Sequence, residues 1–145
     1  MAKKFKDWGK GKDTYRRFVM QKALVEKHFP LFKCSFNNRE LTCIGKIKPA
    51  EGCETYTVQI RYRSGGKPKV HVLNPSIDWN ENIHMYHDGS LCLYYPPETP
   101  WKHTSNLHET IIPWTAEWLV FYELYLLTGV WEGESAPHPI CDLEG

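Results

Sequence analysis

The chain has 145 residues, of which 41% are hydrophobic and 24% charged. These values are typical of one globular domain and exclude a disordered chain. Its formal net charge of +1 excludes a global field that would draw the protein to nucleic acid or to an anionic membrane. Aromatic residues make up 14% of the chain; such side chains can fill a core, but they also concentrate at binding surfaces, so the excess suggests a partner without naming one.

The N-terminal residues are strongly basic. Lysine and arginine gather at Lys3, Lys4, Lys6, Lys10, Lys12, Arg16 and Arg17. We expect residues 1–12 to form a solvated basic tail; a patch for nucleic acid or an acidic partner is the alternative.

The cysteine count and the hydropathy predict the compartment. The chain has five cysteines, an odd number, and its N-terminus lacks the apolar stretch of a signal peptide. We therefore expect reduced thiols and a cytoplasmic protein. No apolar run approaches the ~20 residues that span a bilayer, so no membrane contact is expected.

The first half of the chain predicts one helix followed by strands. Asp13-Thr14 is an N-cap candidate, apolar residues follow at helical spacing from Tyr15 to Phe29, and Pro30 ends the helix. Strands are expected at 41–47, at 56–63, where apolar and polar residues alternate, and at 70–73, after a turn at 64–68. Asn74-Pro75 ends the last of them.

The second half predicts a long loop and a second helix. Residues 77–112 have poor periodicity and several prolines, which is typical of a functional loop. Pro113 suits the first turn of a helix and Gly129 suits its end, with a nearly continuous apolar run between them. Residues 132–145 are expected to form an extended tail lying back over the domain. The order of elements predicts one α+β domain over 1–145.

Cys92 is the candidate for chemistry, because Gly89-Ser90 precede it and Leu91 and Leu93 flank it. This arrangement would bury the leucines and point the thiol the other way, where it could react if it is accessible. On local grounds alone, such a cysteine is more often a small buried residue than a nucleophile. Three chemistries use such a residue. A zinc site would use His84, His87 and Cys92, but it lacks the paired short spacing of structural zinc sites, so no metal is expected. A cysteine hydrolase with a histidine base and a thioester-forming transferase remain open on the residues alone.

A family resemblance favours the transferase. His84 followed by Gly89-Ser90-Leu91-Cys92-Leu93 resembles the active-site segment of ubiquitin-conjugating enzymes, and the element order is similar along nearly the whole chain. His84-Met85-Tyr86, residues 114–131 and Pro137-His138 are similar to the standalone bacterial members of short type II CBASS antiphage operons. The resemblance implies the ubiquitin-conjugating (UBC) fold: an N-terminal helix, a four-stranded antiparallel meander, a catalytic loop and a C-terminal helix.

The resemblance also implies the activity. Cys92 would form a thioester with the C-terminal glycine of a cGAS-like nucleotidyltransferase and pass the acyl group to an amine, with no cofactor. Met85-Tyr86 stand where the family has Pro-Asn, so the usual oxyanion or loop support is missing. His84 is expected to support the loop, and His138 to accept a proton from the attacking amine.

Aromatic residues near the loop and on the second helix are candidates for both the core and the partner-binding surface: Trp101, Trp114, Trp118 and Tyr122. A helix that is apolar nearly all round is more often buried than docked to a partner. The alternative function is a catalytically inactive scaffold of the same fold that only binds the nucleotidyltransferase. The missing Pro-Asn favours it, and the retained Cys92 argues against it.

Overall fold

The structure, a computed structural model, describes residues 2–93 and 101–133. The described residues form two helices and a four-stranded antiparallel sheet, so the predicted α+β class is confirmed. The helices are α1 (Ala2–His28) and α2 (Ile111–Thr128). The strands are β1 (Lys33–Phe36), β2 (Glu40–Ile47), β3 (Tyr56–Arg63) and β4 (Lys69–Asn74), in the order β1-β2-β3-β4.

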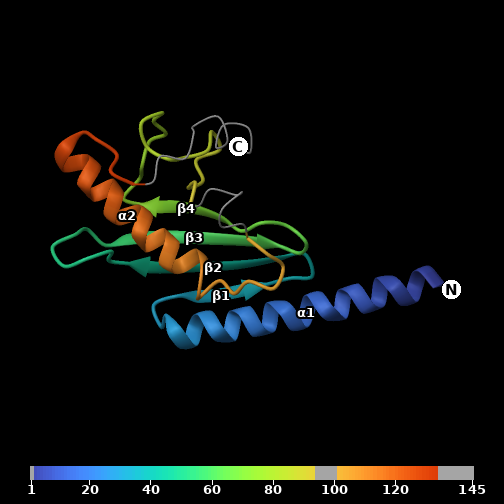
Figure 1. The fold of residues 1–145 in the computed structure, drawn as a ribbon. Coiled ribbons are helices and arrows are strands. Elements are labelled where there is room, and N and C mark those ends of the chain that lie inside the picture. Colours follow the sequence, from blue (N-terminus) through green and yellow to red (C-terminus); the bar gives the residue numbers. More distant parts are fainter. Residues whose placement is uncertain (1, 94–100, 134–145) are drawn as a thin grey trace.

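The sheet is a meander in which each strand pairs with the next. Tyr56, Val58, Ile60 and Tyr62 of β3 are buried and alternate with more exposed residues, as the sequence predicted. The buried face packs with α2, which lies across the sheet, while α1 runs beside β1 (Figure 1). The N-terminal end of α1 extends beyond the sheet (Figure 1). The other face of the sheet carries the polar side chains of the alternation.

One expected boundary was wrong, and one strand was not located from the sequence pattern. The first helix begins at Ala2, so Asp13-Thr14 is not its cap and most of the expected basic tail is helical. Lysine is a good helix former, and two glycines do not end the helix in this segment. Residues 33–36, which the sequence pattern did not locate, form β1, because four residues are too few to display a period of two.

The free edge of β1 is occupied by an ion pair from α1. Glu26 accepts a hydrogen bond from the Cys34 N–H at 2.8 Å, and Lys22 Nζ donates to the Cys34 carbonyl at 2.8 Å. Lys22 and Glu26 also bond each other at 2.7 Å. These contacts satisfy backbone groups that would otherwise be open to another strand.

Cys34 and Cys43 form a disulfide across β1 and β2, where they are direct partners with their Cα atoms 4.1 Å apart. This corrects the expectation that the thiols are reduced. The physical reason is the strand register, which places both side chains opposite each other on the buried side of the sheet.

The second helix ends where the sequence predicted. Gly129 has a φ of 76°, in the left-handed region, and its N–H donates to the Tyr125 carbonyl at 2.8 Å. The first turns of α2 are buried, but Leu126 and Leu127 near its end are exposed. No helix in the described part of the chain is both long enough and apolar enough to cross a bilayer.

Candidate functional site

Cys92 lies in a short hairpin that folds back on itself. Its N–H donates to the His84 carbonyl at 3.0 Å, Met85 and Leu91 form a β-bridge, and the Tyr86 N–H donates to the Ser90 carbonyl at 2.9 Å. We call residues 84–92 the cysteine hairpin. The segment that the sequence predicted as an irregular loop therefore fixes the Cys92 backbone by ordinary strand pairing.

The turn of the cysteine hairpin is explained by its sequence, Asp88-Gly89. The Gly89 N–H donates to the Tyr86 carbonyl at 3.0 Å, and Gly89 has a φ of 87°. A turn followed by a glycine in the left-handed region is one of the common hairpin connections, and Asp-Gly between apolar residues is a strong signal for a hairpin. Asp88-Gly89 lies between Met85 and Leu91, so the turn was readable from the sequence, but a hairpin was not expected there.

Asp88 organises this turn through its carboxylate. One oxygen, Oδ1, accepts hydrogen bonds from the Ser90 N–H at 2.9 Å and the Ser90 hydroxyl at 2.6 Å, and Oδ2 accepts one from Lys69 Nζ of β4 at 2.6 Å. Partial burial opposes ionisation of this group. The hydrogen bonds from Lys69 and Ser90 outweigh it and lower the pKa of Asp88 to about 2. Asp88 is therefore an ionised turn residue over the physiological pH range.

His84 has a structural environment. Its side chain is buried and stacks on the Trp131 ring, with centroids 5.2 Å apart. Its carbonyl accepts from both the Cys92 N–H and the Trp118 indole N–H, the latter at 2.8 Å. Trp118 thus ties the cysteine hairpin to α2. Sequence reasoning gave Trp118 a different role, and no local pattern predicts a contact across 34 residues.

The Cys92 side chain is 5% exposed, and its neighbour Leu91 is buried too. The thiol is therefore buried, as the local pattern favoured, and it does not reach solvent opposite its neighbours. Cys92 is also disulfide-bonded in this structure, so it carries a free thiol only after reduction.

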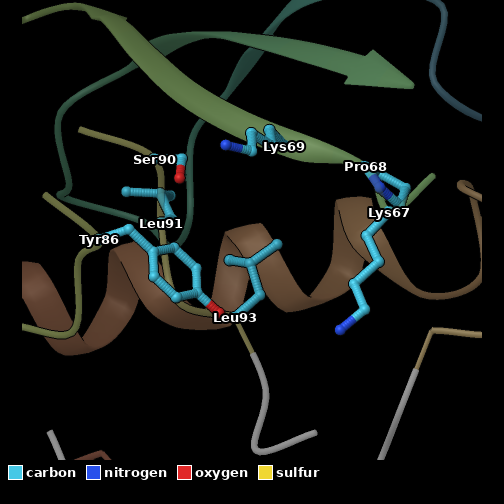
Figure 2. A pocket seen from close by; sticks show the side chains of 7 residues that line it. All are labelled: Lys67, Pro68, Lys69, Tyr86, Ser90, Leu91 and Leu93. Atoms are coloured by element: carbon cyan, nitrogen blue, oxygen red, sulfur yellow. The ribbon is translucent and has the colours of Figure 1, made fainter. Parts of the chain in front are cut away.

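A pocket of about 70 Å³ lies between the cysteine hairpin and the start of β4 (Figure 2). Figure 2 shows Lys69 extending from the strand toward Ser90, with the Tyr86 ring on the other side of the pocket. The walls combine apolar side chains with two lysines, and the lining residues are Lys67, Pro68, Lys69, Tyr86, Ser90, Leu91 and Leu93.

The expected partner-binding aromatics divide into two groups. Trp101 and Trp118 are buried, 8% and 3% exposed, and therefore belong to the core of this chain. Trp114 and Tyr122 are half-buried on α2 and keep part of their surface in solvent. His138, the expected proton acceptor, lies outside the described residues. Among the residues that the structure describes, no three His, Cys, Asp or Glu side chains are grouped so as to hold a metal ion.

Comparison with known proteins gives a family match. The sequence profile described as "Type II CBASS E2 protein" matches residues 21–139, which include both the cysteine hairpin and α2. A search of curated proteins gave no match.

Proposed function

Since the chain belongs to the Type II CBASS E2 protein family, we propose that this E2-like protein of CBASS antiphage defence is a cysteine-dependent acyl transferase with Cys92 as its nucleophile. The observation that carries the proposal is the position of Cys92. This residue ends a hairpin that backbone hydrogen bonds hold together, and it lies within the region that matches the family. The α+β arrangement is compatible with a ubiquitin-conjugating fold.

The proposed donor is the C-terminal glycine of a cGAS-like nucleotidyltransferase, presented in activated form. The Cys92 thiolate attacks the activated carbonyl carbon, the bond to the activating group breaks, and a thioester forms. A lysine or N-terminal amine then attacks the same carbonyl. The carbon–sulfur bond breaks, its electron pair returns to Cys92 Sγ, and the amine proton passes to a base, for which His138 is our candidate.

The cysteine hairpin supports this proposal because its hydrogen bonds hold the loop, which is one role that the missing Pro-Asn would have. Cys92 is held by its own hydrogen bond to His84, and His84 is held in turn by Trp118. A fixed backbone places the sulfur in one position, and positioning is the main source of rate in an enzyme with few catalytic groups. We assign His84 the role of loop support, which agrees with its buried and stacked ring.

The second candidate function is a scaffold that binds the nucleotidyltransferase without chemistry. The burial of Cys92 favours it, because a nucleophile has to be reached by its substrate. Trp114 and Tyr122 on α2, which retain solvent-exposed surface, are our candidates for the docking contacts of either function.

The test uses a donor that needs no activating enzyme. The reduced protein is mixed with a synthetic peptide thioester that ends in glycine, and adducts are measured by intact mass and on non-reducing gels. Exchange at Cys92 releases the small thiol and adds the peptide acyl group. An adduct that persists in a phosphine reductant, that excess thiol or hydroxylamine removes and that Cys92→Ala lacks supports the transferase. Binding of the nucleotidyltransferase without any adduct supports the scaffold.

A further inference from the structure

The turn of the cysteine hairpin carries the ionised carboxylate of Asp88, which pairs with a lysine of the sheet. Asp88 Oδ2 accepts from Lys69 Nζ at 2.6 Å, and Lys69 belongs to β4. His71 of the same strand donates from Nε2 to the Asp88 carbonyl at 3.3 Å. Two side chains of β4 therefore hold the backbone and the carboxylate of one turn residue.

A backbone contact continues this connection toward Cys92. The Leu91 N–H donates to the Val70 carbonyl of β4 at 2.9 Å, and Leu91 is bonded directly to Cys92. Between Asp88 and Leu91, Ser90 gives both its N–H and its hydroxyl to Asp88 Oδ1. Ser90 is 1% exposed, so its two donors have little water to turn to and depend on Asp88. Asp88 thus controls both the shape of the turn and its docking against the strand.

We propose that Asp88, together with Lys69, is a positioning residue for Cys92: the ion pair fixes the turn of the cysteine hairpin against β4 and thereby sets the place of the nucleophile. The inference rests on the proposed function for its catalytic meaning. Its geometry stands without it, because each contact joins described residues of the hairpin and the sheet.

The two carboxylate oxygens of Asp88 accept hydrogen bonds from different residues, Oδ1 from Ser90 and Oδ2 from Lys69. Substitutions can therefore remove the two contacts separately. Asp88→Asn keeps an oxygen for the Ser90 donors but removes the charge that Lys69 pairs with. Asp88→Ala removes both contacts. Lys69→Met removes only the ion pair. Glu51→Gln is the matched control, because Glu51 makes an exposed ion pair with Lys48 at 3.7 Å in the loop after β2.

The first readout is the rate of thioester formation with the glycine-ending peptide thioester, separated into kcat and KM. We expect kcat to fall about tenfold in Asp88→Ala and about threefold in Asp88→Asn, because small displacements of a reacting atom are costly. KM should stay within about twofold, and the Glu51→Gln control should match the wild type. The double variant of Asp88→Asn and Lys69→Met should be no slower than the slower single variant, because both remove the same contact.

The second readout needs no acyl transfer, so it tests the inference even if the proposed function fails. Iodoacetamide alkylation of reduced Cys92 is followed by peptide mass spectrometry, with the partly exposed Cys53 as an internal reference. Asp88→Ala should raise Cys92 alkylation about tenfold and leave Cys53 unchanged, since freeing the turn exposes a thiol that is otherwise buried.

The outcomes separate the two proposals. No adduct with the wild type overturns the transferase, while the alkylation result still decides the role of Asp88. Unchanged alkylation in Asp88→Ala overturns the positioning role. So does a normal kcat in Asp88→Ala, or a loss of rate that only follows the loss of folded protein measured by thermal unfolding.

Discussion

Trp118→Phe tests the link between α2 and the cysteine hairpin. The substitution keeps an aromatic ring in the core but removes the indole N–H, which donates to the His84 carbonyl at 2.8 Å. That carbonyl still accepts the Cys92 N–H at 3.0 Å, so no buried acceptor is left without a partner. The change therefore removes one hydrogen bond and part of one ring, without a further desolvation penalty.

The expected destabilisation is about 2 kcal/mol. A net hydrogen bond contributes about 0.5–1.5 kcal/mol. The lost part of the ring contributes about 1 kcal/mol more, for roughly 40 Å² of apolar surface at ~25 cal/mol per Å². Urea denaturation measures this loss. The thioester rate per folded molecule should also fall, since the hairpin has lost its contact with the helix.

Leu119→Ala is the control for this experiment. Leu119 is fully buried next to Trp118 on α2, and its truncation costs about 2–5 kcal/mol without touching a polar contact of the hairpin. We expect Leu119→Ala to lower stability and to leave the thioester rate per folded molecule unchanged. Equal rates in the two variants would refute the reasoning that Trp118 holds the cysteine hairpin.

Three further predictions concern single residues. Gly89→Ala and Gly129→Ala each force alanine into a positive φ, 87° and 76°, and each should cost about 1–2 kcal/mol by urea denaturation. Only Gly89→Ala should slow thioester formation, and equal rates would contradict the role of the turn. The lowered pKa of Asp88, about 2 against an ordinary 3.8, means that its ionised form stabilises the fold above about pH 4. The stability difference between wild type and Asp88→Asn should therefore be constant near neutral pH, shrink as the pH falls from about 4 to 2 and vanish only below about pH 2; a difference at pH 2 as large as that at pH 7 would be inconsistent with this pKa. Gly45→Ala should cost about 1–3 kcal/mol, because its Cβ would lie 2.3 Å from the buried Phe32 ring; an unchanged urea midpoint would show that the ring can move.

Much of the fold was predictable because its signals are local. The alternation from Tyr56 to Arg63 and the glycine at 129 each carry their structural cause within a few residues. The start of α1 was not predictable in this way, because lysine-rich sequence is compatible with a helix or with a solvated tail. The disulfide of Cys34 and Cys43 depends on the register of two strands, one of which the pattern did not locate.

The candidate site was predictable only in part. Its motif singled out Cys92, and the Asp88-Gly89 pair could have indicated a hairpin where a loop was expected. The contacts of Trp118 with His84 and of Lys69 with Asp88 join elements that are distant in the chain. Such contacts follow from how the elements pack together, so they cannot be predicted from a single sequence without its fold.

The most direct test of the central claim is the intact mass of the reduced protein after incubation with the glycine-ending peptide thioester. The claim predicts one added peptide acyl group, located on Cys92 by peptide mapping, removed by excess thiol or by an added amine, and missing from Cys92→Ala. An unmodified mass under conditions in which the protein is folded and Cys92 is reduced would contradict it.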